Sequence, residues 1–501
     1  MFSVLRKFLQ FNEDSNNQSN CQIWYYFVIR TAVVSSFFFL HRAFSIDNTE
    51  ALYWGQELMW VYPKHPPLFA WMSELWFNLV GGNLFLYHSC STFLTSGGIV
   101  ASFYLFLYLT GNKKTSFLAA VLIDGATFYN WAHQGLNANT ILYPIWPLIC
   151  LFYLKAIEKN KIKNWLLFGL MSGLGVLGKY NSILITFFCA IFTLYDKETR
   201  KKLLTFNPYF SLIPFFILVV PHFYFVFQSG GSSISYIVNN SPKLSAGLFF
   251  KLKEFGVWLG SVLILNCLPM LMAIFLMVVR MNKKNANELL SGELFKNGNL
   301  KFFCNLVVYG SLFFWLCYSL FLCKPRTAWF SPHYFIISLF FIQFVYNNII
   351  KSRQKYAILF ILFVTIVSSF LGELMSSSFM NDGREERREL TEELITEWRN
   401  KYEECPRYTT YKDVTIYGRS ICGHKIHMIL TDEIEQNPWK ININDMLKSG
   451  VLIVNEDGER SVASFVKLFG IARYENKMMC KKNKVDGRSK CGMRMIQFYH
   501  Q

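Results

Sequence analysis

Two carboxylates follow the first long apolar stretch of the sequence. Asp47 and Glu50 are three residues apart, so they share one face if this segment is helical. On that face Asp47 could be a catalytic carboxylate. The spacing also fits a capping box, in which Asp47 begins a short helix and Glu50 closes it. The two interpretations are compatible, and both stay open.

A basic pair lies further along the same polar segment. Lys64 and His65 precede two prolines, which force an extended backbone and then permit a new helix. His65 could ligate a metal ion or donate a hydrogen bond to a phosphate. Alternatively, Lys64 and His65 simply lie among the lipid head groups. Residues 68–80 contain two tryptophans and are typical of an amphipathic helix in the membrane interface.

Amides and a lysine occupy two later connections between apolar runs. Asn137 and Asn139 could bind sugar hydroxyls through their side-chain amides, or Asn139 could cap the next helix. Lys179, followed by Tyr180, lies at membrane depth, where a lysine needs an anionic or polar partner. A lipid-linked phosphate is one such partner. The alternative is that the lysine side chain reaches up to the interface.

Three more candidates lie near the ends of apolar runs. His222 could be a ligand or a packing residue. Arg326 could bind a phosphate with two parallel hydrogen bonds, or be an ordinary interfacial charge. Trp329 could stack on a sugar or anchor its helix at the interface.

The elements that position these residues are predicted to be membrane helices. The chain has 501 residues, is 52% hydrophobic, and repeats apolar blocks long enough to cross a bilayer. Its net charge of +17 would also suit a nucleic-acid-binding protein. However, the basic residues are spread over short loops and form no single patch, which argues against nucleic acid as a partner.

The apolar pattern predicts about 11 transmembrane helices. The basic residues fall in alternate connections, which the positive-inside rule assigns to the cytoplasm. The connections that hold the candidate residues then face the periplasm. The predicted spans are 23–41, 86–109, 116–132, 139–156, 165–178, 181–195, 208–227, 255–279, 302–322, 332–350 and 355–372.

The predicted domains follow from this pattern. Residues 1–22 form a cytoplasmic segment, and 23–372 form the membrane domain with a catalytic outer loop at 42–85. Residues 373–501 are more polar and predict a small soluble α/β domain on the periplasmic side. Its expected elements are a helix over 381–402 and strands at 407–411, 414–417, 425–430 and 451–454. Four cysteines in this region, at 405, 422, 480 and 491, permit two disulfides in an oxidising compartment, although their connectivity stays open and free thiols are the alternative.

Taken in order, these stretches resemble a known family. Asp47 with Glu50, then KHPPLFAW, GLNANTILYPIWPL, LGKYNS and VVPHFYFV are similar to the bacterial GT-C glycosyltransferases of the protein-mannosyltransferase-like group. That group includes lipid A aminoarabinose transferase and the lipid A core galacturonosyltransferases. The resemblance covers roughly residues 40–350. The C-terminal domain is similar to the periplasmic domains that end many such enzymes.

The resemblance implies a multi-pass glycosyltransferase of the bacterial inner membrane. It would move a sugar from a polyprenyl-phosphate donor to a periplasmic lipid, glycan or protein, with inversion. Asp47 would be the general base, and a divalent metal ion could assist. The residues implied to bind the donor phosphate are Lys179, Tyr180 and Arg326; those for other substrate contacts are His65, Lys64, Asn137, Asn139 and Trp329; and those for the metal are Glu50, His65 and His222.

Three positions depart from the family pattern. Asn48, Lys64 and Asn139 stand where the family commonly has acids, which removes ligands for a divalent ion. Two alternatives therefore remain beside the transferase. One is a transporter or flippase of a lipid-linked sugar, although no internal repeat supports it. The other is a noncatalytic homologue.

Overall fold

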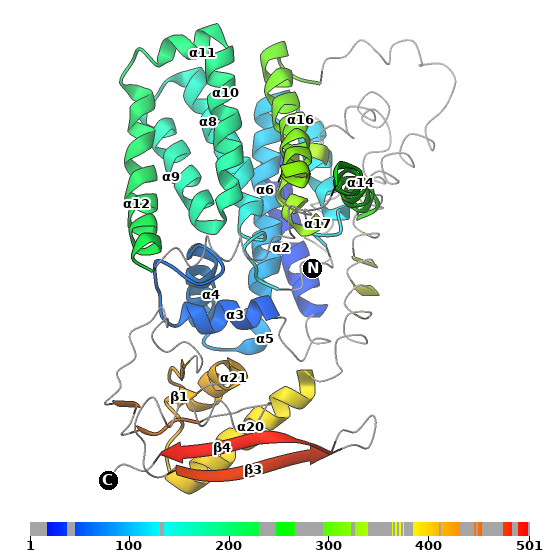
Figure 1. Ribbon diagram of the computed structural model, residues 1–501. Coiled ribbons are helices and arrows are strands. Elements are labelled where there is room, and N and C mark those ends of the chain that lie inside the picture. Colours follow the sequence, from blue (N-terminus) through cyan, green and yellow to red (C-terminus); the bar gives the residue numbers. More distant parts are fainter. Residues whose placement is uncertain are drawn as a thin grey trace. The chain divides into compact units, whose positions relative to one another are not determined.

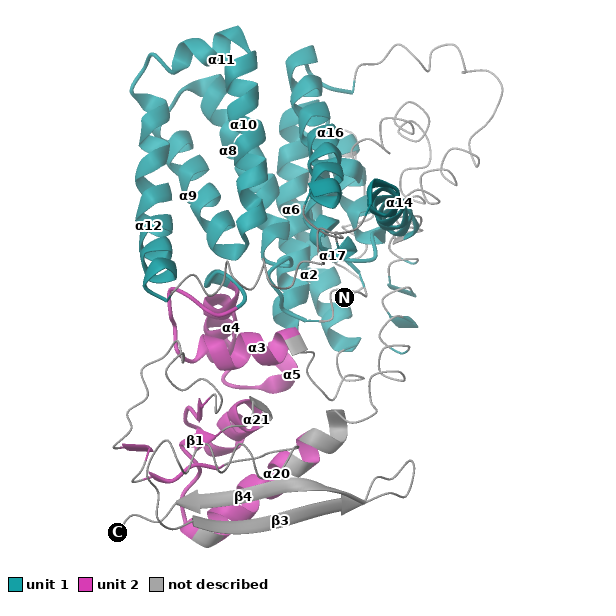
Figure 2. Cartoon of the chain, in the orientation of Figure 1, with its two compact units in different colours: residues 1–40, 64–68, 88–375 teal, residues 41–63, 69–87, 376–501 magenta. Residues whose placement is uncertain are grey.

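A computed structural model describes most of the chain. The described residues are 18–37, 46–130, 135–229, 247–265, 294–321, 326–338, 363, 366–367, 370–371, 374, 384–409, 412–429, 445–446, 449–452, 474–482 and 489–498. The chain divides into two compact units (Figure 2). Unit 1 comprises residues 1–40, 64–68 and 88–375, and unit 2 comprises 41–63, 69–87 and 376–501.

Unit 1 is a bundle of helices (Figure 1). In it α6 packs against α2 and α8, α9 packs against α8 and α12, and α16 packs against α10 and α14. Its main helices are α2 (Gln18–Ser36), α6 (Ser89–Thr110), α7 (Lys113–Leu122), α8 (Leu142–Lys159), α9 (Ile162–Gly178), α10 (Ile183–Tyr195), α11 (Lys197–Lys202), α12 (Leu212–Gln228), α14 (Leu248–Leu265), α16 (Gly298–Phe321) and α17 (Thr327–Phe330).

Three stretches of the described helices are long and apolar enough to cross a membrane. They are Leu84–Thr110, Asn207–Gln228 and Gly298–Phe321. Shorter apolar helices, including α9 and α10, lie beside them in the bundle. Most of the predicted spans coincide with helices of unit 1. Parts of the spans at 116–132, 255–279, 332–350 and 355–372 lie outside the described residues, so the number 11 stays a prediction.

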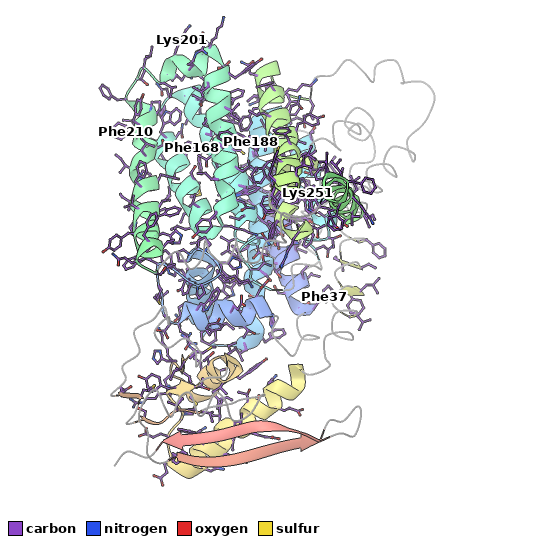
Figure 3. The ribbon with its side chains drawn as sticks, viewed as in Figure 1. Phe37, Phe168, Phe188, Lys201, Phe210 and Lys251 are labelled. Carbon is purple, nitrogen blue, oxygen red and sulfur yellow. A yellow bond between two sulfur atoms is a disulfide. The ribbon has the colours of Figure 1, made fainter. Side chains whose placement is uncertain are left out.

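Glycines and caps explain where these helices meet and end. A Cβ on Gly169 of α9 would lie 1.8 Å from the carbonyl oxygen of Ser211, so only glycine permits this approach beside α12. Gly310 of α16 likewise leaves room for the ring of Phe188 on α10 (Figure 3). The side chain of Asn112 caps α7 by accepting a hydrogen bond from the Thr115 amide. Helix ends and crossings are thus set by local sequence.

Unit 2 combines three short N-terminal helices with the C-terminal region. The helices are α3 (Ile46–Gly55), α4 (Leu68–Leu79, within unit 2 from Phe69) and α5 (Leu84–Tyr87). The C-terminal region contributes α20 (Arg384–Tyr402), β1 (Tyr408–Thr409), α21 (Lys412–Cys422), β2 (His427–Met428), β3 (Tyr474–Lys482) and β4 (Ser489–Phe498). Strands β1 and β2 pair in parallel, and β3 and β4 pair antiparallel. The two units are groups of residues in mutual contact and are not the continuous domains predicted from the sequence. The predicted domain limits therefore stay predictions.

The predicted helix over 381–402 is confirmed as α20, and the strands at 407–411 and 425–430 contain β1 and β2. Of the predicted strand at 451–454, Leu452 forms a bridge with Thr409. The strand predicted at 414–417 is wrong, because these residues lie in α21.

The error has a physical cause. Val414 packs into one cluster with Leu394, whereas Ile416 and Tyr417 pack into another with Leu52. Two-sided burial of a helix hides its period, and the β-branched residues then suggest a strand.

The sequence left the pairing of the four cysteines in this region open. Cys405 and Cys422 form a disulfide that joins the segment before β1 to the last residue of α21. Cys480 and Cys491 are opposite each other in the register of β3 and β4. One of the two disulfides that the sequence permits is therefore observed, and the presence of a second stays a prediction.

Candidate active site

The residue at the centre of the site is Lys179, in the break between α9 and α10. Helix α9 ends at Gly178, Lys179 is extended, and a short 3-10 turn leads into α10. A Cβ on Gly178 would lie 3.0 Å from Leu142 and 3.8 Å from Leu68, so the break packs tightly against the start of α8. The lysine side chain is partly buried, and its Nζ donates a 2.6 Å hydrogen bond to Asn139 Oδ1. Lys179 therefore has the polar partner that the sequence predicted it would need, and this partner is a side chain of the same protein.

The turn before α8 holds Asn139 in place. Asn137 Oδ1 accepts hydrogen bonds from the amides of Asn139 at 2.8 Å and Thr140 at 3.3 Å. Thr140 in turn donates to the Asn137 carbonyl. Asn137 therefore shapes the turn, while the side chain of Asn139 reaches Lys179. The alternative in which Asn139 caps α8 is not observed, because its side-chain oxygen accepts from the lysine and the cap position of α8 is Ile141.

Two cations lie near the indole ring of Trp329. Lys179 Nζ is 5.4 Å from the centroid of the indole ring, and the Arg326 guanidinium is 5.9 Å from it. Both distances are within the range of cation–π attraction. Arg326 is exposed at the start of α17, so its guanidinium is accessible. The ring thus joins the two residues predicted to bind phosphate.

His65 belongs to the same cluster. Burial lowers the pKa of His65, and the charges of Lys179 and Lys64 lower it further, to about 3. The imidazole is therefore neutral at physiological pH and can still donate one hydrogen bond. The same two cations oppose the approach of a metal ion, so the surroundings of His65 favour an anion.

Tyr180 and His222 form a separate pair next to Lys179. The Tyr180 hydroxyl and His222 Nε2 are 2.9 Å apart, and Tyr180 also stacks with Phe223. His222 is fully buried in α12, one residue after Pro221. Its ring nitrogen is thus engaged by a hydroxyl, which agrees with the packing role considered from the sequence and fixes Tyr180.

Asp47 and Glu50 lie in unit 2, on α3. Both side chains are partly buried, and their three-residue spacing places them on one face of the helix, as predicted. Asp47 is within the first helical turn, where the helix dipole favours a carboxylate, and the helix already includes Ile46. This position fits the capping box less well than a carboxylate inside the turn. The catalytic role of Asp47 stays a prediction.

The predicted metal ligands do not form a ligand set. In the described parts of the chain, one group of three close metal-ligating side chains occurs: Cys405, Cys422 and His424. Its two cysteines form a disulfide and so cannot ligate as thiolates. His65 is flanked by cations, and His222 bonds Tyr180. Metal binding by Glu50, His65 and His222 therefore stays a prediction, and no chemical step is derived through a metal ion.

A buried ion pair in unit 1 was not predicted. Arg30 of α2 and Asp124 are 2.7 Å apart, and both side chains are almost fully buried. Tyr26 donates a 2.5 Å hydrogen bond to the same carboxylate. Arg30 also donates to the Tyr129 carbonyl, and Tyr129 stacks on Tyr143 at 4.2 Å. The signal was available, because a charge inside an apolar run requires a partner.

Tyr143 extends this network toward the site. Its hydroxyl is 2.9 Å from Ser331 Oγ, directly after α17, which carries Trp329. A continuous set of contacts thus runs from the buried ion pair to the helix that bears the indole ring.

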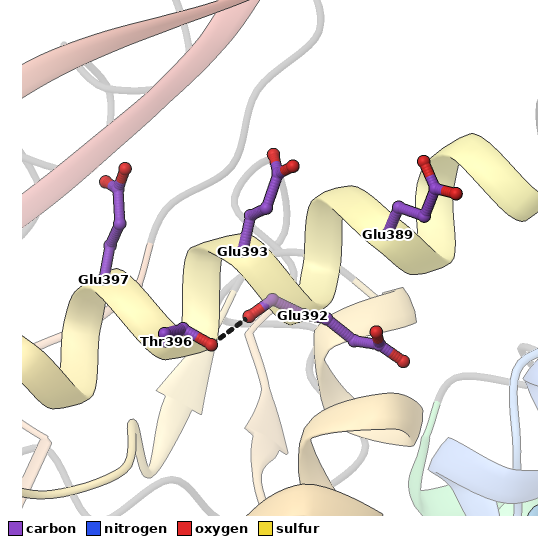
Figure 4. Close-up of a pocket in the computed structure, with 5 residues that line it drawn as sticks. All are labelled: Glu389, Glu392, Glu393, Thr396 and Glu397. Atoms are coloured by element: carbon purple, nitrogen blue, oxygen red, sulfur yellow. Dashed lines mark hydrogen bonds between the residues drawn. The ribbon is translucent and has the colours of Figure 1, made fainter.

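An open pocket in unit 2 is lined by acids and does not overlap these residues. Its volume is about 440 Å³, and Figure 4 shows Glu389, Glu393 and Glu397 on one side of α20. Glu392 points the other way and pairs with Arg388 at 2.8 Å. These three glutamates are four residues apart, so they lie one above another on the same face of the helix. An acidic helix face of this kind is an ordinary solvated surface.

Part of the chain matches a known protein family. Residues 64–225 match the family described as dolichyl-phosphate-mannose-protein mannosyltransferase. This segment of the chain is similar to those mannosyltransferases. The matched segment includes Lys64, His65, Asn139, Lys179 and His222, and the family resemblance predicted from the sequence is confirmed.

Two further proteins are similar. The lipopolysaccharide core galacturonosyltransferase RgtA of Rhizobium johnstonii is 27% identical over 192 residues, which are 36% of this chain and 37% of the relative. The chain thus matches well under half the length of that relative. The crystal structure of ArnT from Cupriavidus metallidurans bound to undecaprenyl phosphate covers 94% of this chain and 97% of its own, with a TM-score of 0.55 and 11% identity. That likeness shows the fold, which is the multi-pass helical fold of a membrane protein.

Proposed function

We propose that this protein is an integral-membrane glycosyltransferase that takes a sugar from a polyprenyl-phosphate donor. The acceptor is a periplasmic lipid, glycan or protein. The observation that carries the proposal is the cluster of Lys179, Asn139, Trp329 and Arg326, which come from three separate stretches of unit 1. It offers two cations and an aromatic face, and these suit a phosphate joined to a sugar.

The relatives support the same substrate class. RgtA is named as a galacturonosyltransferase of the lipopolysaccharide core, and ArnT was solved with undecaprenyl phosphate. A polyprenyl phosphate donor and an envelope glycolipid acceptor are therefore the first pair to test.

In the proposed reaction the acceptor oxygen displaces the polyprenyl phosphate from the anomeric carbon, with inversion. Asp47 removes the proton from the acceptor hydroxyl. The leaving phosphate gains negative charge as the bond breaks, and Lys179 and Arg326 stabilise that charge. His65 is neutral and can donate a hydrogen bond to a phosphate oxygen without adding charge. Tyr180 is hydrogen-bonded to His222 and lies next to Lys179 in the sequence, so it is a further donor-binding residue in this proposal.

The proposed topology has about 11 transmembrane helices, a cytoplasmic N-terminus and a periplasmic C-terminal domain in the bacterial inner membrane. Helix α10 agrees with the basic-loop pattern. Lys179 precedes it, and the basic helix α11 follows its other end. Its 13 residues separate the two by roughly 20 Å.

The test uses purified protein in lipid nanodiscs with undecaprenyl-phosphate-linked sugars and core lipopolysaccharide. Mass spectrometry of the acceptor should detect one added sugar, and envelope glycans from a deletion strain should lack the same sugar. Transfer that persists in Asp47→Asn would overturn the role of the base. Movement of the donor across vesicles without any product would favour a flippase instead.

A further inference from the structure

The acid-bearing helix α3 is in backbone contact with α4. A Cβ on Gly55, the last residue of α3, would lie 2.6 Å from the Ala70 carbonyl oxygen and 3.1 Å from the Glu74 nitrogen. Only a glycine permits this approach, so α3 is set against α4 with little freedom to shift. The position of α3, and of Asp47 on it, therefore depends on what holds α4.

An arginine from the C-terminal region holds α4. Arg419 of α21 binds the Glu74 carboxylate with two hydrogen bonds, Nη1 to Oε2 at 2.6 Å and Nη2 to Oε1 at 2.9 Å. The two side chains are only 10% and 6% exposed. The guanidinium also lies 4.3 Å from the centroid of Phe77, one turn further along α4. A paired fork geometry at this burial fixes direction as well as distance.

Further contacts attach the same region to the end of α3. Lys425 donates a 2.6 Å hydrogen bond to the carbonyl of Gln56, and His427 is 2.7 Å from the carboxylate of Glu57. Leu52 of α3 also packs in one cluster with Ile416 and Tyr417 of α21.

The disulfide stabilises the helix that supplies the arginine. Cys422 ends α21 three residues after Arg419, and its bond to Cys405 ties that end to the segment before β1. The disulfide thus fixes the end of α21 close to Arg419, the residue that binds α4.

We propose that Arg419 and Glu74 are positioning residues for sugar transfer. Through them the C-terminal domain fixes α4 and α3, and thereby the orientation of Asp47 and Glu50. This inference rests on the proposed function, in which Asp47 is the base. It gives the C-terminal domain a role in catalysis without any direct contact with substrate.

The test compares Arg419→Ala with Arg388→Ala in the full-length protein in nanodiscs. Arg388 also pairs with a glutamate, but its side chain is 45% exposed, so its loss should leave kcat unchanged. Arg419→Ala should lower kcat by about tenfold to a hundredfold, because small displacements of a catalytic group have effects of that size. The KM for the donor lipid should stay within twofold, since the proposed donor residues lie in unit 1.

Hydrogen exchange provides a readout that does not depend on activity. Amides of residues 46–55 should exchange faster in Arg419→Ala and should be unchanged in Arg388→Ala. The exchanged pair Glu74→Arg with Arg419→Glu should restore both slow exchange and part of kcat. Arg419→Lys keeps the charge but loses the two parallel hydrogen bonds to Glu74, and it should give a kcat below that of the wild type and above that of Arg419→Ala. It serves as the test variant if Arg419→Ala does not fold.

The outcomes separate this inference from the proposed function. If the wild type transfers sugar and Arg419→Ala keeps both its kcat and slow exchange in α3, the positioning role is wrong. If the exchange of α3 responds as expected but the wild type transfers nothing, the coupling of α21 to α3 stands and the assigned reaction fails.

Discussion

Replacing Lys179 by methionine tests the cation on which the proposed donor site depends. Methionine keeps much of the length of the side chain and removes its charge. The ammonium is held by Asn139 at 2.6 Å and faces the ring of Trp329 at 5.4 Å, so it is already oriented before any donor binds. The loss should therefore appear in transfer and not in the fold of the bundle.

The expected size follows from the chemistry of the contact. A hydrogen bond to a charged group contributes about 1.5–3 kcal/mol, and the Coulomb energy at 4 Å near a protein surface is about 4 kcal/mol as an upper limit. A loss of about 2–3 kcal/mol lowers kcat/KM by about 30- to 150-fold. Because charge develops on the phosphate as it leaves, most of this should fall on kcat.

The assay is steady-state sugar transfer in nanodiscs, with donor and acceptor varied in turn. Lys163→Met is the matched control, because Lys163 is exposed near the other end of the same helix, α9. It should stay within twofold of the wild type. A second readout is the titration of His65, whose pKa should rise when the Lys179 charge is removed. Wild-type kcat/KM in Lys179→Met, together with an unmoved His65 pKa, would refute this reasoning.

Four other outcomes are expected. Asn139→Ala should raise the KM for donor about fivefold to tenfold, as expected for one lost hydrogen bond, and an unchanged KM would count against the orienting role. Neutral His65 stabilises the fold above pH 6.5, its ordinary pKa, and this contribution is lost as pH falls toward about 3. The free energy of unfolding changes by at most about 1.4 kcal/mol per pH unit, and screening by water reduces this. His65→Gln should therefore make the melting temperature depend less on pH below pH 6.5. Arg30→Leu should lower the free energy of unfolding by about 3–5 kcal/mol, because it leaves the Asp124 charge buried without its partner. The double variant Arg30→Leu with Asp124→Leu should recover much of that loss, and a double variant as unstable as the single one would argue against a buried ion pair. EDTA should change kcat by less than twofold. If EDTA abolishes transfer and added divalent metal restores it, a bound metal ion takes part in the reaction.

Several residues of the candidate site stand out in the sequence because they share one property. Lys179, Asn139, Arg326 and Trp329 are polar, charged or aromatic groups next to long apolar runs, where unpaired groups are costly. That argument predicts which residues need partners, and it does not say which partners they take. The contact of Tyr180 with His222 depends on how α10 meets α12, which no local pattern encodes.

The parts that were not predicted depend on long-range packing. Arg30 and Asp124 are 94 residues apart, and Arg419 and Glu74 are 345 apart. Each residue alone fits several local explanations, such as a positive charge near a loop or an acid on an amphipathic helix. Only the fold shows that both carboxylates are buried with an arginine. The helix α21 was misread for the same reason, since its two buried faces pack on different clusters.

The charges around Lys179 in unit 1 suit a phosphate, which is the group that we propose this region binds. Asn139 orients the Lys179 ammonium through a neutral amide, so this contact does not cancel the positive charge. A carboxylate at that position would form an ion pair and weaken the attraction for an anion. Burial, together with the charges of Lys179 and Lys64, lowers the pKa of His65 and keeps it neutral, which conserves a hydrogen-bond donor and disfavours a cation. The departures at Lys64 and Asn139 thus act in one direction, because both make the region more attractive to a phosphate and less so to a metal ion.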